Sequence, residues 1–160
     1  DMMRRAKIEV KTVGVTGEFV TGSHGVTVKA DLKPEEISFN NIDGVVLPGG
    51  MPGTVNLGKS ETVTKAAVYC AENGKITAAI CAAPSVLGNL GILKGKKATC
   101  FPGFEKELEG ATYTAAPVEI DGNVITGKGA GCAILFGKAI VEKAVSAEAA
   151  NKVCGDMQCP

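Results

Sequence analysis

The sequence contains no tryptophan, only one histidine and no excess of charge of either sign. Lysine and arginine together number 17, as do aspartate and glutamate, so the formal net charge is zero. A nucleic-acid-binding protein usually carries an excess of basic residues, and a solvating tail usually carries an excess of acidic residues. The balanced charge therefore indicates neither class. No apolar run approaches the roughly 20 residues that cross a bilayer, and no targeting peptide is recognisable. We therefore expect neither nucleic acid nor a membrane as a partner.

The six cysteines form no C-x-x-C pair and no recognisable disulfide framework. Cys154 and Cys159 come closest, five residues apart in a tail that contains a glycine. Because disulfides persist mainly in oxidising compartments, we expect reduced thiols and a cytoplasmic protein. The single histidine, His24, has no second ligand at metal-site spacing, so we expect no metal site, and nothing indicates another cofactor.

Apolar strands alternate with helices along the chain. Its 160 residues, 45% hydrophobic and 21% charged, are enough for one globular domain with a sizeable core. Near-continuous apolar strands between helices predict an α/β protein with a doubly wound parallel sheet. Strands are expected within 7–15, 40–50, 76–80, 96–100 and 111–129, helices within 60–75, 82–91 and 131–146, a hairpin-like excursion within 20–31, and a loosely ordered tail at 151–160.

Local signals mark several element boundaries. Ser60 is a predicted helix N-cap, the pair Asn73-Gly74 a helix stop, and Asp121-Gly122 a hairpin turn. The opening residues 1–6, DMMRRA, are typical of the last turns of a helix, with two basic residues near its end. Since a strand normally precedes such a helix, we expect residues 1–160 to form a single domain that lacks its first strand and part of its first helix.

Two turns at the ends of predicted buried strands could carry chemistry. The first, LPGGMPG (47–53), matches neither a Walker loop nor G-x-G-x-x-G, but its adjacent glycines leave backbone N–H groups free for an oxyanion hole. The second holds Cys81 between a strand and a helix that begins near Pro84. Such a residue sits on a sharp turn with strained backbone angles, and the start of the helix would favour a thiolate. A plain connecting turn and a packed cysteine are the structural alternatives.

The segments VVLPGGMPGTVNL and AAICAAPSVLGNLGILKGKKAT resemble the ThiJ/PfpI superfamily, in particular the branch of the human parkinsonism-associated deglycase. DMMRRAKIEV at the start and GKGAGCAILFGKAIVE near the end fit the same branch, so the resemblance covers nearly the whole chain. It implies a flavodoxin-like fold with a mostly parallel sheet sandwiched by helices, a homodimer, and Cys81 as nucleophile. It also implies an oxyanion pocket of backbone N–H groups from the Gly49-Gly50 turn and Ala82.

The sequence departs from the family pattern at several places, among them Gly129-Ala130-Gly131, where many relatives have Gly-Pro-Gly. Family members carry a glutamate just after the first strand, and that segment is not in this chain. The branch often has a histidine where this sequence has Phe101, which excludes a Cys–His dyad from that position. The protease-like branch has a histidine after the nucleophile where this chain has Ala82, which counts against a peptidase.

Three residues are weaker candidates for accessory roles. His24 lies in a loop where relatives often carry a basic residue near the dimer-facing site, and a solvated loop residue is the alternative. Cys100 would lie beside the site as a packed or accessory redox thiol. Ser85 could hydrogen-bond within the first turn of its helix.

Two functions follow from the resemblance. The first is a glyoxalase III-type enzyme or protein deglycase that needs no glutathione, with Cys81 adding to methylglyoxal-type α-oxoaldehydes or their adducts. The family's glutamate would move the proton, so its absence predicts an impaired enzyme. The alternative is a non-enzymatic oxidative-stress sensor or redox-regulated chaperone that acts through oxidation of Cys81.

Overall fold

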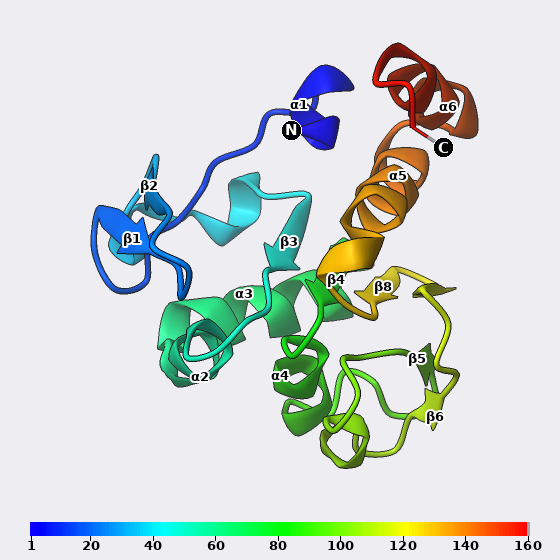
Figure 1. Cartoon of the computed structure of the whole chain (residues 1–160). Coiled ribbons are helices and arrows are strands. Elements are labelled where there is room, and N and C mark those ends of the chain that lie inside the picture. Colours follow the sequence, from blue (N-terminus) through cyan, green and yellow to red (C-terminus); the bar gives the residue numbers. More distant parts are fainter. Residues whose placement is uncertain (160) are drawn as a thin grey trace.

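The computed structural model describes residues 1–159, and a four-stranded sheet in the order β3-β4-β8-β7 forms its centre (Figure 1). Strands β3 (Gly44–Leu47), β4 (Ile76–Ile80) and β8 (Val124–Gly127) run parallel, and β7 (Val118–Asp121) pairs antiparallel with β8. The three parallel strands contain no charged residue. The predicted mostly parallel sheet is therefore confirmed.

Helices cover both faces of this sheet. The side chain of Ala79 belongs to a core cluster with residues of α3 (Glu61–Glu72) and α4 (Pro84–Asn89). The neighbouring Ala78 belongs to a second cluster with residues of α5 (Ala133–Ala144). Successive side chains of a strand point to opposite faces, so β4 is buried from both sides. The molecule is an α/β sandwich of the predicted flavodoxin-like class.

The predicted boundaries of α3 are confirmed by its caps. The hydroxyl of Ser60 accepts a hydrogen bond from the Val63 N–H, as an N-cap does. At the other end Asn73 is the C-cap, and Gly74 has φ +67°, which a glycine adopts without strain. Helix α2 (Gly53–Lys59) precedes α3 and ends at the same Ser60.

Two hairpins also agree with the sequence signals. Strands β1 (Phe19–Thr21) and β2 (Thr27–Lys29) pair antiparallel and project from the sheet region (Figure 1). The β7–β8 hairpin pairs Asp121 with Val124, so its two-residue turn is Gly122-Asn123, one position later than the predicted signal.

Shorter elements complete the chain. Strands β5 (Lys97–Ala98) and β6 (Thr112–Tyr113) form a small parallel pair. Residues 1–159 also form the 3-10 turns η1 (Pro34–Glu36), η2 (Phe39–Asn41), η3 (Glu105–Glu107) and η4 (Ala130–Cys132).

The strand predicted at 7–15 is wrong. After helix α1 (Met2–Arg5), this segment makes only one bridge, between Val13 and Leu32. Two of its backbone groups pair with side chains instead of a neighbouring strand: Arg4 donates to the Val10 carbonyl, and the Asp31 carboxylate accepts from the Thr12 N–H. Without a neighbouring strand over its length, no ladder forms.

The prediction of a loosely ordered tail at 151–160 is also wrong for the described residues. Helix α6 (Ala147–Asp156) begins at Ser146, whose hydroxyl accepts from the Ala149 N–H, and buries Ala150 and Val153. It packs on α5. Two features of the sequence indicate this helix: the capping Ser146 and the apolar residues Ala150 and Val153, three positions apart. Gly155 obscures them, because glycine disfavours the interior of a helix. Pro160 lies outside the described residues.

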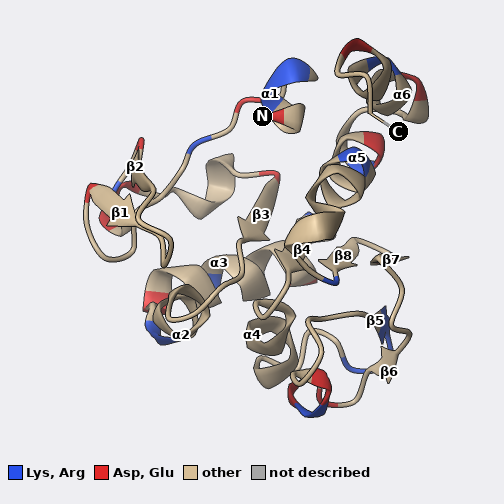
Figure 2. Ribbon diagram, viewed as in Figure 1, with Lys and Arg blue, Asp and Glu red and all other residues tan. Residues whose placement is uncertain are grey.

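Charged residues lie mainly on the helices, turns and chain ends, and the three parallel strands β3, β4 and β8 carry none (Figure 2). Within residues 1–159, every helix is too short or too polar to serve as a membrane span.

Candidate active site

Cys81 occupies a strained turn directly after β4. Its φ is +67°, a conformation that costs a side-chain-bearing residue roughly 1–2 kcal/mol. Two backbone hydrogen bonds hold it there: the Cys81 N–H donates to the Gly127 carbonyl at 2.8 Å, and the Phe101 N–H donates to the Cys81 carbonyl at 2.7 Å. The predicted sharp strand-to-helix turn is therefore confirmed as geometry. Strain of this kind collects at functional sites.

The Gly49-Gly50 turn lies against Cys81. A Cβ atom at position 49 would stand 2.5 Å from the Cβ of Cys81, 2.5 Å from the Ile80 carbonyl oxygen and 3.1 Å from the Ala82 nitrogen. Only glycine permits this approach without a shift of the surrounding backbone. The parallel pairing of β3 with β4 brings the two turns to the same edge of the sheet, as predicted.

The backbone beside Cys81 carries unused donors. Within residues 1–159, the N–H groups of Gly49, Gly50 and Ala82 have no hydrogen-bond acceptor. Gly50 has φ +90°, and its carbonyl accepts from both the N–H (2.8 Å) and the hydroxyl (3.0 Å) of Thr54. These bonds fix the orientation of the turn at the start of α2.

Cys100 is buried beside the site and is poorly suited to be a nucleophile. Burial raises its pKa to about 11, with further contributions from the Glu105 carboxylate and from Cys81. At neutral pH the side chain is therefore a protonated thiol. Between the two neighbouring thiols, the more accessible Cys81 is the better candidate for reaction.

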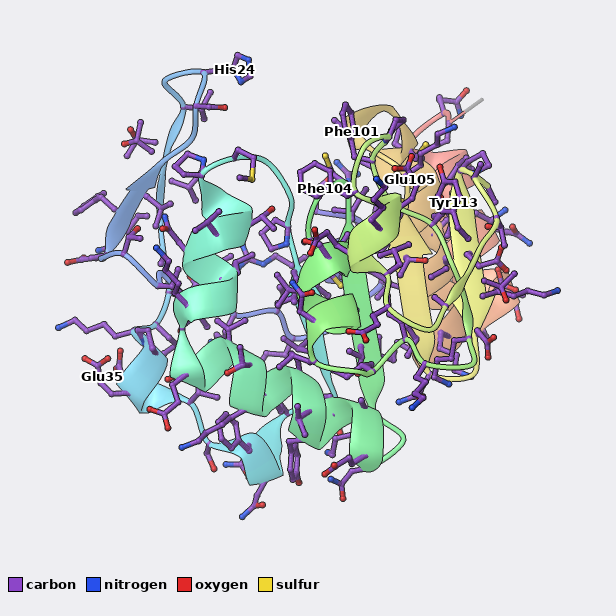
Figure 3. All side chains as sticks on the ribbon, turned by 90° about the horizontal axis from the view of Figure 1, so that it is seen from below. His24, Glu35, Phe101, Phe104, Glu105 and Tyr113 are labelled. Atoms are coloured by element: carbon purple, nitrogen blue, oxygen red, sulfur yellow. The ribbon has the colours of Figure 1, made fainter. Side chains whose placement is uncertain are left out.

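Glu105 and Tyr113 are neighbours that the sequence did not point to. Figure 3 shows both on the side of the molecule where Phe101 lies. The Glu105 carboxylate accepts from the Gly103 N–H at 2.8 Å, which together with its own N–H lowers its pKa. Burial makes the largest contribution to the raised pKa of Tyr113, and the neighbouring Cys100 and Glu105 raise that pKa further. No motif signals this group, because η3 and β6 bring it together only in the folded chain.

The remaining two candidates occupy different places. His24 lies at the tip of the β1–β2 hairpin, apart from Phe101, with its Nδ1 3.1 Å from the Ser23 hydroxyl (Figure 3). The Ser85 hydroxyl donates to the Ala82 carbonyl at 2.6 Å and so braces the turn that follows Cys81. Within this chain, the structure brings Ser85 to the site and leaves His24 outside it.

An open depression of about 390 Å³ adjoins the two turns between α2, α4 and η3. Met51 and Ser85 line it, whereas Cys81 does not. Among residues 1–159, no group of three or more His, Cys, Asp or Glu side chains is placed to hold a metal ion.

Comparison with known proteins agrees with this geometry. A family model described as the DJ-1/PfpI family matches residues 1–143. Protein DJ-1 homolog B of Arabidopsis thaliana is 35% identical over 160 residues, which cover 98% of this chain and 36% of the plant protein. A deglycase of Pyrococcus abyssi is 36% identical over 112 residues, or 68% of this chain and 66% of the archaeal protein.

The crystal structure of Drosophila melanogaster DJ-1beta matches with a TM-score of 0.92 at 33% identity, covering 100% of this chain and 88% of the fly chain. This chain thus spans little more than a third of the plant relative.

Proposed function

Because the chain belongs to the DJ-1/PfpI family, we propose that it is a cysteine-dependent, glutathione-independent glyoxalase or protein deglycase. Its substrates would be methylglyoxal-type α-oxoaldehydes or their adducts. The observation that carries this proposal is the strained Cys81 turn, against which Gly49 packs. In the described part of the chain, three backbone N–H groups beside this turn remain unused. The name of the archaeal deglycase supports the same class of reaction.

In the first step the Cys81 thiolate attacks the aldehyde carbon. A carbon–sulfur bond forms, and the π electrons of the carbonyl move to its oxygen, giving a hemithioacetal alkoxide. The N–H groups of Gly50 and Ala82 would donate to this oxygen. Donors already held in place stabilise such a charge without reorganisation, and a single one contributes about 3–4 kcal/mol in well-studied oxyanion holes.

The later steps move a proton and add water. A proton passes from the carbon that bears sulfur to the neighbouring oxygenated carbon, and hydrolysis of the resulting thioester restores the thiol. Methylglyoxal and one water thereby yield lactate, with no net oxidation. The proton transfer needs a base, and the resemblance assigns that role to a glutamate that residues 1–160 do not include.

Lactate formation from methylglyoxal tests this function. We expect the full-length protein to produce lactate and its Cys81→Ala variant to lose roughly 100-fold or more of that activity, because the covalent intermediate is lost. Cys132→Ala is the matched control, since Cys132 is also half-buried but lies outside the turn. Equal rates for the full-length protein and its Cys81→Ala variant would contradict the proposal.

The same site favours one alternative, an oxidative-stress sensor or redox-regulated chaperone. A sulfinate on Cys81 would place its oxygens where the N–H groups of Gly50 and Ala82 can donate, and no general base is needed. Mass spectrometry after mild peroxide treatment tests it: the alternative requires two added oxygens on Cys81. A Cys81 without added oxygen would contradict it.

We also propose a homodimer in the cytoplasm. All six thiols are free in the structure, which suits a reducing compartment. The β1–β2 hairpin exposes several large apolar side chains, which suits an interface with a second copy.

A further inference from the structure

Helix α6 ends in a Schellman motif that brings two cysteines together. The Cys159 N–H donates to the Cys154 carbonyl at 2.9 Å, the Gln158 N–H donates to the Gly155 carbonyl at 3.0 Å, and Gln158 has φ +53°. These are the two hydrogen bonds and the left-handed residue that define the motif. Side chains at the two ends of its outer hydrogen bond commonly touch, and here both are cysteines.

The geometry is compatible with a covalent bond between them. Standard bond lengths on either side of the 2.9 Å hydrogen bond hold the two Cα atoms within about 6.8 Å of each other. Disulfides join residues whose Cα atoms are about 4.4–6.8 Å apart. Both side chains are half-buried, so small reagents can reach them.

Cys154 and Arg5 both influence the ionisation of Cys159. Burial raises the pKa of Cys159 and the thiol of Cys154 raises it further, while the Arg5 guanidinium opposes both. Arg5 belongs to α1, which lies near the end of α6 in Figure 1. The pair is therefore a cluster of two thiols and one cation.

We propose that Cys154 and Cys159 form a redox-active dithiol that closes to an intrachain disulfide when a peroxide oxidises it. The Cys154 thiolate attacks a peroxide oxygen, the oxygen–oxygen bond breaks, and the departing hydroxide takes up the proton that the thiol released, giving a sulfenic acid and water. The second thiol then attacks that sulfur, a sulfur–sulfur bond forms, and a second water leaves. The two thiols lose two electrons and two protons in total, and a dithiol reductant restores them.

This site is separate from the proposed active site. Helix α6 packs on α5 at the end away from the β4–α4 junction that holds Cys81 (Figure 1). Closure would fasten the last turn of α6 to the residues that cap it. The proposal therefore stands whether or not Cys81 is a catalytic nucleophile.

Peptide mapping of the whole protein tests the proposal. Trypsin cleaves after Lys152, so both cysteines fall in one peptide that begins at Val153, and residues 153–160 contain no other cysteine. After hydrogen peroxide and alkylation without reductant, we expect this peptide to carry no alkyl group and to have lost two hydrogens. Dithiothreitol should restore two alkylatable thiols, and Cys81→Ala should behave identically. Oxygen gained by Met157 in the same peptide does not change the number of alkylated thiols.

Single variants distinguish a pair from two separate thiols. In Cys154→Ser the remaining Cys159 should stay alkylatable or gain oxygen, and Cys159→Ser should do the same for Cys154. Cys132→Ser should leave closure unchanged. Two alkylatable thiols after peroxide, separate oxygen additions on both cysteines of the unsubstituted chain, or disulfides between two chains would each overturn the proposal.

Discussion

At the scale of single residues, the contact of Gly49 with Cys81 sets the strictest limit on the site. An alanine Cβ at position 49 would overlap the Cys81 Cβ and the Ile80 carbonyl oxygen, both at 2.5 Å, and neither is the end of a flexible side chain. We expect Gly49→Ala to lower the free energy of unfolding by about 1–3 kcal/mol, as overpacking does, and to change the alkylation rate of Cys81.

Urea denaturation and timed alkylation check this expectation. Gly53→Ala is the matched control, because a Cβ there meets nothing within 4 Å and the residue begins α2. If Gly49→Ala were as stable as Gly53→Ala, the close approach would not constrain the turn.

The raised pKa of Cys100 leads us to expect that the stability of the folded chain depends on pH, again through a single residue. Its pKa in the folded chain is about 11, against 9.0 for an ordinary thiol, so the folded state keeps this proton longer than the unfolded state. The resulting stability is fully present below pH 9 and is lost as the pH rises toward 11. At pH 8 the folded chain should hold about 100-fold less Cys100 thiolate than an ordinary thiol would.

Denaturation at several pH values, compared with Cys100→Ser, measures the effect. The unsubstituted chain should lose more stability between pH 9 and 11 than the variant. An identical loss of stability in both proteins would show that the folded chain does not keep the Cys100 proton to a higher pH than the unfolded chain does.

At the scale of elements, Asn123 joins the β7–β8 turn to the end of α3. Its amide donates to the Lys75 carbonyl at 2.8 Å and to the Ala71 carbonyl at 3.2 Å in a half-buried setting. Asn123→Ala would remove the amide donor from both carbonyl groups, and the Lys75 carbonyl would keep only its 3.3 Å hydrogen bond from the Thr77 hydroxyl. We expect the substitution to cost about 1–3 kcal/mol of unfolding free energy. Asn73→Ala, which removes an exposed amide bond to the Tyr69 carbonyl, should cost less in the same urea titration. The reverse order would contradict this role.

The elements that the sequence predicted well carry local signals. Ser60 and Gly74 mark the ends of α3, and a run of small or apolar residues marks β4. The segment 7–15 alternates like a strand but has no partner strand along its length, and pairing is not a local property. Helix α6 depends on burial against α5, which its polar, glycine-containing sequence does not reveal.

The candidate site could be predicted only in part, and the reason is similar. Cys81 and Gly49 each stand in a recognisable turn, and the parallel order of β3 and β4 makes their meeting a consequence of topology. Glu105 and Tyr113 reach Cys100 through loops whose paths no periodicity encodes. Distances across such loops become known only from the folded chain.

At the scale of the whole molecule, the β1–β2 hairpin is an apolar surface without a covering element. Phe19 is 64% exposed, Val26 68% and Val28 54%, on a two-stranded ribbon that has no third strand in the part of the chain described. An isolated ribbon is marginally stable in water, and a second copy of the chain would both cover these side chains and support the ribbon. We therefore expect the protein to sediment at twice its 16.3 kDa chain mass.

A charge placed on this ribbon should separate the two copies, because an interface core excludes unpaired charge. Phe19→Asp should shift the sedimenting species toward the single-chain mass at a concentration where the unsubstituted protein is a dimer. Val145→Asp is the matched control, since Val145 is 52% exposed at the end of α5, away from the hairpin, and its substitution should leave the dimer intact. Far-ultraviolet circular dichroism would show that Phe19→Asp is folded. A dimer that survives Phe19→Asp would assign the interface to another surface, and a single-chain mass for the unsubstituted protein would contradict the dimer itself.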